Sequence, residues 1–145
     1  MNRLNKILKA RELLRECGEY DTSVAGAVGE VYAEEMLGMK KAERGAAGYD
    51  GWINDRKVQV KTKEFYRKDP SSRYVAISRK NEGKADDLVV VVLDDGELGS
   101  VRHLGPIPIG KIKCSASQIQ SRYYYRDILA ACAAANESER ADRRS

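Results

Sequence analysis

The chain has 145 residues, of which 42% are hydrophobic and 33% charged, and it carries a net charge of +4. Its length predicts a single domain, and its hydrophobic content, which includes eight tyrosines, is too high for a disordered chain. No apolar run approaches the roughly 18 residues of a membrane-spanning helix, and the charged N-terminus does not resemble a secretory signal. Three widely spaced cysteines without a CxxC pair indicate free thiols in a reducing compartment. We therefore expect a cytoplasmic protein that does not contact a membrane.

Hydrophobic spacing and turn residues predict an alternation of helices and strands. The predicted helices span residues 2–16, 22–37 and 117–135, and a frayed polar tail spans 136–145. The predicted strands span residues 49–53, 56–65, 74–78, 88–93 and 100–104. A loop is expected at 40–48, and irregular or edge structure at 105–110, where two prolines cannot donate to a strand ladder.

This order of elements predicts an α/β fold with a mixed central β-sheet of about five strands flanked by helices. The continuous apolar run at 88–93 is typical of a strand that is buried on both faces. One domain is expected over residues 1–135. Its parts are an N-terminal helix within 1–18, a core at 22–104 and a C-terminal helix at 117–135.

Positive charge is concentrated in one stretch of the chain, residues 51–80. This stretch contains nine basic and three acidic residues, a local net charge of +6. Such a block can be a solubilising face, and it is also what a protein needs to contact the phosphate backbone of a nucleic acid. The charge distribution alone does not decide between these two interpretations.

The predicted strand at 56–65 has one hydrophobic and one polar face. Gln59 and Lys61 share the polar face, while Val60 between them points the other way. If this strand forms a hairpin with the one before it, Asp50 lies near Gln59 and Lys61. The Asp50 carboxylate, the Gln59 amide oxygen and the Val60 carbonyl are hard oxygen ligands of the kind that Mg²⁺ prefers. Lys61 is suited to orient a metal-bound water or to offset charge on a phosphate.

A further acidic group is predicted on the preceding helix. Glu30 shares a helical face with Gly26, Ala27, Ala33 and Leu37, which favours an inward orientation of its carboxylate. Because a buried carboxylate needs a charged partner or a metal ion, Glu30 is a further candidate ligand.

Taken together, Gly29-Glu30 in a helix, Asp50 in a strand and Gln59-Val60-Lys61 in the next strand resemble the motif of the PD-(D/E)XK nuclease superfamily. The resemblance is to restriction endonuclease-like proteins and archaeal-type Holliday junction resolvases, and it covers about residues 22–104. It implies a restriction endonuclease-like fold and a metal-dependent DNA endonuclease that hydrolyses phosphodiester bonds. The implied catalytic residues are Glu30, Asp50, Gln59 and Lys61.

The resemblance also implies a cofactor and a partner. Mg²⁺, with Mn²⁺ as a substitute, would be bound by Asp50, Gln59, Val60 and Glu30. Gln59 stands where most members of the superfamily have Glu or Asp, which removes a negative charge from the metal site. DNA is the implied partner, and a homodimer is expected where both strands are cut. The expected DNA contacts are the basic residues around the strand, namely Lys57, Lys63, Arg67, Lys68 and Arg73.

Alternative interpretations remain open. The polar strand face can be merely solvated, with Asp50 as a turn residue. The protein can also keep a nuclease fold and bind DNA without cutting it, because of Gln59, or it can be a protein-interaction or inhibitor module. Gln120 and Tyr124, four residues apart on the predicted final helix, are either a packing pair or a Q-x-x-x-Y element similar to that beside RecB-like sites.

Overall fold

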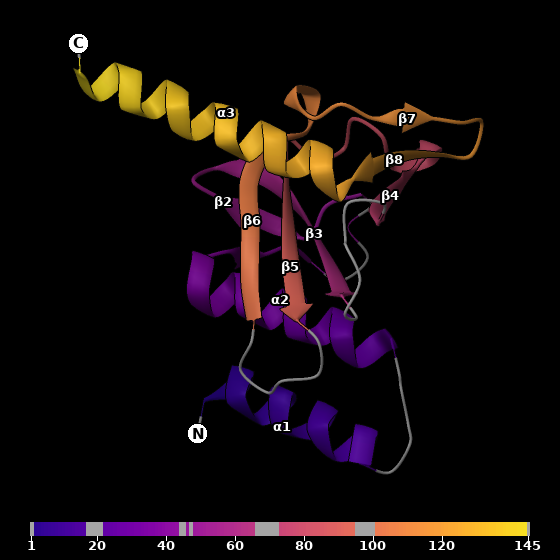
Figure 1. The fold of residues 1–145 in the computed structure, drawn as a ribbon. Helices are drawn as coiled ribbons and strands as arrows, with labels where there is room; N and C mark the ends of the chain where they lie inside the picture. Colours follow the sequence, from indigo (N-terminus) through magenta and orange to yellow (C-terminus); the bar gives the residue numbers. More distant parts are fainter. Residues whose placement is uncertain are drawn as a thin grey trace.

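A five-stranded mixed sheet forms the centre of the protein in the computed structural model, which describes residues 2–16, 22–43, 46, 48–65, 73–94 and 101–144 (Figure 1). Its strands, in spatial order, are β1 (Lys40–Lys41), β2 (Gly51–Ile53), β3 (Arg56–Phe65), β5 (Asp87–Asp94) and β6 (Val101–Pro108). Strands β3 and β5 are parallel, and the other neighbouring pairs are antiparallel. The predicted α/β class with a mixed central sheet of five strands is confirmed.

The hairpin between β2 and β3 carries most of the candidate site. Asn54 and Asp55 form its two-residue turn with φ angles of 51° and 63°, a left-handed conformation that Asn and Asp tolerate better than most residues. Gly51 pairs with Val58, and a Cβ at Gly51 would collide with the backbone of Lys40. Only glycine therefore allows this close approach of β1 and β2. No described strand pairs with this edge of β3 beyond Val58.

Two helices, α1 (Arg3–Glu16) and α2 (Thr22–Leu37), cover one face of the sheet (Figure 1). Helix α2 contacts β3 and β5, and α1 packs on α2. Leu4 and Leu8 of α1 and Val28 of α2 belong to the buried cluster of this layer. Gly29 lies so close to β3 that a Cβ there would collide with the hydroxyl of Thr62. The absence of a side chain at Gly29 thus lets α2 approach the strand that carries the candidate site.

A second, three-stranded sheet and helix α3 (Tyr125–Arg144) cover the opposite face (Figure 1). The second sheet is antiparallel in the order β4 (Tyr74–Ser78), β8 (Gln120–Tyr124) and β7 (Ser115–Ala116). Val75 and Tyr123 of this sheet and Ile128 of α3 belong to one buried cluster with Val90 of β5. Strand β5 is therefore enclosed on both faces, and residues 88–93 are at most 2% exposed, as the apolar run predicted.

The prediction of a helix from residue 117 is wrong at its start and at its end. Residues 120–124 form β8, and α3 begins at Tyr125 and continues through Arg144 instead of giving way to a frayed tail after 135. Ser121 and Tyr123 are buried, whereas Gln120 and Tyr124 are half-buried, which is the alternation of a strand and not of a helix. Gln120 and Tyr124 therefore share the outward face of β8, and the interpretation of the pair as a helical element is wrong.

Three other expectations need smaller corrections. The segment 40–48 was expected to be a loop but contains β1, and the strand expected at 100–104 continues to Pro108 as β6, an edge strand of the central sheet. The strand at 74–78 exists, but it belongs to the second sheet. Within the described residues, no helix is both long and apolar enough to cross a lipid bilayer.

Candidate metal and nucleic-acid site

Asp50 lies at the free edge of β3. Its backbone N–H donates to the carbonyl of Val58 at 2.8 Å, and its Oδ2 accepts a hydrogen bond from the N–H of Val60 at 2.7 Å. Because Val60 lies between Gln59 and Lys61, this bond fixes the Asp50 carboxylate beside the segment that the sequence singled out. The Val60 carbonyl faces the same edge, since the N–H and C=O of a strand residue face the same neighbour. The second carboxylate oxygen of Asp50, Oδ1, has no hydrogen-bond partner among the described residues.

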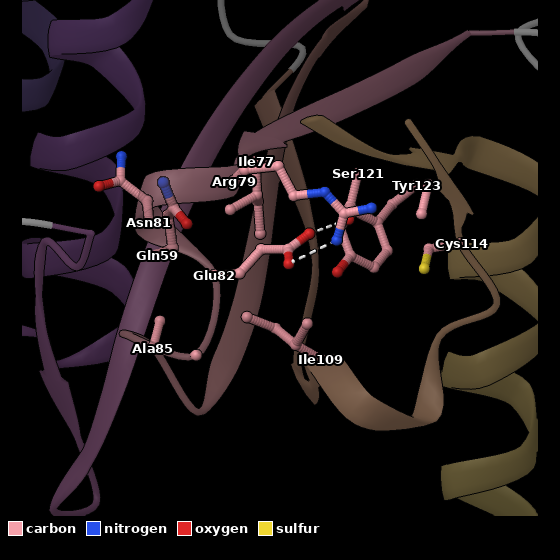
Figure 2. Close-up of a pocket in the computed structure, with 12 residues that line it drawn as sticks. Gln59, Ile77, Arg79, Asn81, Glu82, Ala85, Ile109, Cys114, Ser121 and Tyr123 are labelled. Carbon is pink, nitrogen blue, oxygen red and sulfur yellow. Dashed lines mark hydrogen bonds and ion pairs between the residues drawn. The ribbon is translucent and has the colours of Figure 1, made fainter. Parts of the chain in front are cut away.

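Gln59 is buried and faces a different space from Asp50. The second sheet covers the polar face of β3, and Gln59 retains an exposed fraction of 9%. Its amide oxygen Oε1 has no hydrogen-bond partner in the described part of the chain. The side chain lines a cavity of about 310 Å³ beside the second sheet (Figure 2). Neither Asp50 nor Lys61 lines this cavity, so the structure places Asp50 at the strand edge and the Gln59 amide on the strand face.

Three basic side chains gather where β3 runs beside β4. Lys61 and Lys63 lie half-buried on the polar face of β3, and Arg73 directly precedes β4. Burial lowers the pKa of Lys63, and the positive charges of Arg73 and Lys61 lower it further. No described acidic side chain counteracts this effect on Lys63. Two half-buried lysines close to an exposed arginine favour the binding of an anion such as a phosphate.

The other predicted DNA contacts do not belong to this cluster. Lys57 is exposed near the start of β3, with its Nζ 5.0 Å from the ring centroid of Tyr49. It lies on the same strand face as Lys63 but about 20 Å away, because six residues of strand separate them. Arg67 and Lys68 lie outside the described residues.

Glu30 lies near β3, but the structure does not join it to the other predicted residues. It is half-buried on α2, directly after Gly29, which abuts β3. Glu30 forms no hydrogen bond or ion pair with any described residue. The prediction that its helical face points inward is only partly right, because Ala33 is buried whereas Gly26 and Ala27 are exposed.

Two further acidic residues near the start of β3 have structural partners. Asp87, which is 5% exposed, accepts two hydrogen bonds from the guanidinium of Arg56, both at 2.9 Å. Asp86 accepts a hydrogen bond from the backbone N–H of Lys57 at 3.0 Å. These bonds hold the starts of β3 and β5 together, so the two carboxylates serve the fold instead of the site.

The residues at the strand edge fit a Mg²⁺ ion that keeps most of its water. Such ions are often held by one or two carboxylates together with substrate phosphates. Asp50 Oδ1 and the Val60 carbonyl are oxygen donors at this edge, and Glu30 on α2 is the further carboxylate that the sequence predicts. No group of three or more His, Cys, Asp or Glu side chains within the described ranges can hold a metal ion by itself. A bound ion would therefore have few protein ligands, with water or a phosphate of the substrate as the others.

The outward face of the second sheet carries a basic and aromatic surface that the sequence analysis missed. Tyr74 and Tyr124 pair across β4 and β8 with ring centroids 5.6 Å apart. The guanidinium of Arg122 lies 4.6 Å from the ring centroid of Tyr74, and that of Arg126 lies 5.1 Å from the ring centroid of Tyr124. The interpretation of 117–135 as one helix hid this surface. Tyr123 and Tyr124, aromatic residues of a type that favours strands, are the sequence signal that would have predicted β8.

No protein-family model matches the chain, and no curated protein matches it either. Its function is therefore inferred from its residues and their geometry.

Proposed function

We propose that this protein is a metal-dependent DNA endonuclease of the PD-(D/E)XK type. The observation that carries the proposal is the hydrogen bond from the Val60 N–H to Asp50, which fixes a carboxylate at a free strand edge next to Lys61. Asp50 directly precedes β2 and is held by two hydrogen bonds to β3, the strand that carries Lys61, and catalytic groups require such positioning. Lys61 and Lys63 lie on the same strand, and Arg73 directly precedes β4; these positive charges can bind the phosphates of the substrate.

Each residue of the site has a separate role in the proposal. Asp50, the Val60 carbonyl and Glu30 would bind Mg²⁺ or Mn²⁺; when bound, the ion polarises the phosphodiester and lowers the pKa of a coordinated water. Lys61 orients the attacking water and balances the negative charge that develops on the phosphate. We assign Gln59 to contact with the substrate instead of the metal, because its amide lines a cavity that Asp50 does not line.

The proposed substrate is DNA in the cytoplasm, cut on both strands by a homodimer. Its phosphates would lie along the basic cluster at the end of β3, with Arg67 and Lys68 as further contacts and Lys57 as a distant one. Because such contacts release counterions, the affinity for DNA should fall steeply as the salt concentration rises.

Cleavage of labelled single-stranded, duplex and junction DNA in Mg²⁺ and in Mn²⁺ tests the proposal. Wild type should cut at least one of them, and EDTA should abolish cutting. Asp50→Ala and Lys61→Ala should each reduce the rate by about 100-fold or more. Lys6→Ala is the matched control, because Lys6 is an exposed lysine of α1, which packs on α2 and has no role in the proposed site. Wild-type rates in Asp50→Ala would refute the proposal.

A second candidate function is DNA binding without cleavage. The observation that favours it is the small number of carboxylates at the strand edge, since no described group of three acidic, Cys or His residues can hold a metal. It predicts salt-dependent binding of DNA that persists in EDTA and no cleavage in either metal. The remaining alternative, a protein-interaction or inhibitor module, predicts no salt-dependent affinity for DNA.

A further inference from the structure

The cavity between β3 and the second sheet has the properties of a binding site. Its volume is about 310 Å³, near the lower end of the roughly 300–1,000 Å³ that pockets for small organic groups occupy. This volume fits one ring system better than a larger ligand. Figure 2 shows Gln59 and Asn81 on one side of the cavity and the side chain of Glu82 extending toward Ser121 on the other.

The amide of Gln59 is the feature that points to a ligand. The side chain is more than nine-tenths buried, and its Oε1 has no hydrogen-bond partner among the described residues. A buried amide oxygen without a partner costs about 1–3 kcal/mol of stability. Because the side chain lines the cavity, a rotation of its amide would let a ligand remove that cost by donating a hydrogen bond to Oε1.

The walls of the cavity combine apolar side chains with hydroxyl groups. Ile77, Ala85 and Ile109 supply the apolar part, and the hydroxyls of Ser121 and Tyr123 supply polar atoms. Burial raises the pKa of Tyr123, so its hydroxyl stays protonated and can donate a hydrogen bond.

The one carboxylate among the lining residues is already balanced. Glu82 accepts hydrogen bonds from Ser121 and from the guanidinium of Arg79, the latter at 2.9 Å. These bonds lower the pKa of Glu82 and keep it ionised. Because Arg79 compensates its charge, Glu82 does not require a cationic ligand.

We propose that this cavity receives one unpaired nucleobase of the bound DNA. An amide presents an acceptor oxygen beside a donor nitrogen, which complements the donor and acceptor atoms on the edge of a base. Enzymes that take up an unpaired base hold it in this way, with hydrogen bonds at its edge and apolar side chains against its faces. The inference rests on the proposed function, since it names the class of DNA that the site accepts.

The position of the cavity relative to the basic cluster fits this assignment. Gln59 and Lys61 are two residues apart on one strand face, which corresponds to about 7 Å. One nucleotide can therefore place its base at Gln59 while its phosphate lies near Lys61 and Lys63. Fully paired DNA does not offer such a base, so DNA with an unpaired nucleotide should bind more tightly.

Equilibrium binding in EDTA to three matched DNAs tests the inference without any cleavage. The probes are a duplex with one bulged adenine, the same duplex with an abasic bulge and the fully paired duplex. Wild type should bind the bulged adenine about tenfold more tightly than the abasic bulge, within the range that one buried base contributes. Ala85→Phe, which fills the cavity, should remove this preference and leave the affinity for the abasic duplex unchanged. Ala133→Phe, on the exposed face of α3 and away from the cavity, is the matched control and should keep the preference.

A second variant covers the case in which Ala85→Phe does not fold. Gln59→Met keeps the size of the side chain, loses its hydrogen-bonding atoms and should also reduce the preference. Equal wild-type affinity for the adenine and abasic bulges would overturn the inference and leave the proposed function intact. A preference that survives both variants would overturn the assignment to this cavity. Absence of salt-dependent binding to all three DNAs would refute the proposed function and the inference together.

Discussion

Replacement of Gln59 by methionine should make the protein more stable. The side chain is 9% exposed, and its Oε1 has no hydrogen-bond partner in the described part of the chain. A buried polar group without a partner costs about 1–3 kcal/mol, and methionine has a similar volume without the polar atoms. Because only Oε1, and not the amide nitrogen, is buried without a partner, we expect a gain of about 1–2 kcal/mol in the free energy of unfolding.

The assay is urea unfolding of wild type and Gln59→Met, followed by tyrosine fluorescence and circular dichroism. Gln120→Met is the matched control, because Gln120 lies on the outward, half-buried face of β8, where the same change should alter stability by less than about 0.5 kcal/mol. A Gln59→Met protein that is less stable than wild type would refute the reasoning, since it would mean that the amide makes favourable interactions in the free protein. A gain in stability with a loss of DNA affinity is the pattern of a residue kept for function.

Three further changes test the site and the fold around it. Asp50→Asn keeps an oxygen that can accept the hydrogen bond from the Val60 N–H, so urea unfolding should show a loss of less than about 1 kcal/mol of stability. The rate of DNA cleavage should nevertheless fall by about 100-fold, and an unchanged rate would contradict the metal role of Asp50. Gly29→Ala should destabilise the protein by about 1–3 kcal/mol, because the added Cβ would collide with the hydroxyl of Thr62. In the double variant, Thr62→Ala should relieve part of that loss. If the two single-variant changes in stability simply add, the contact is absent. Because the pKa of Lys63 is lowered in the folded protein, Lys63 binds more protons in the unfolded chain than in the folded protein. The contribution of Lys63 to the free energy of unfolding therefore rises as the pH approaches the ordinary pKa of 10.5. Lys63→Met should therefore be more stable than wild type at neutral pH, and urea unfolding should show this advantage shrinking toward about pH 10, whereas a constant difference would contradict the shift.

The elements that the sequence predicts well have local signals. Strand β3 alternates between apolar and polar residues after the Asn54-Asp55 turn, and its predicted bounds are those of the structure. Helices α1 and α2 also follow from hydrophobic spacing and, for α2, from Gly38 at its end, whose φ is 70°. In each of these elements, the residues that decide the structure are neighbours in the chain.

The elements that the sequence does not predict depend on distant partners. Strand β8 pairs with β4, with Tyr124 opposite Tyr74, so its conformation is fixed by residues about 50 positions earlier. The alanine-rich segment that follows β8 has a high helix propensity, and it extended the predicted helix backwards over Gln120. The resulting error also hid the second sheet.

The same error limited the prediction of the site. The approach of Asp50 to Gln59-Val60-Lys61 follows from the hairpin and could be predicted from its turn. The burial of Gln59 could not, because the side chains that cover it come from the second sheet and the segments around it. The sequence suggested one polar face with a single role, whereas the structure gives Asp50 the strand edge and Gln59 the enclosed face.

Under the proposed function, this separation changes the role of the glutamine, because PD-(D/E)XK nucleases usually have an acid at this position. A carboxylate at Gln59 would be buried without a described cation as its partner, which is more costly than an unpaired amide. An amide costs less stability when it is buried, and it can form hydrogen bonds with the edge of a base. Glutamine is therefore suited to a position that lines a substrate-sized cavity. The metal would then depend on Asp50 and on phosphates that the basic cluster at Lys61 and Lys63 holds. DNA binding would therefore complete the metal site, and the affinity for metal should be weak until DNA is bound.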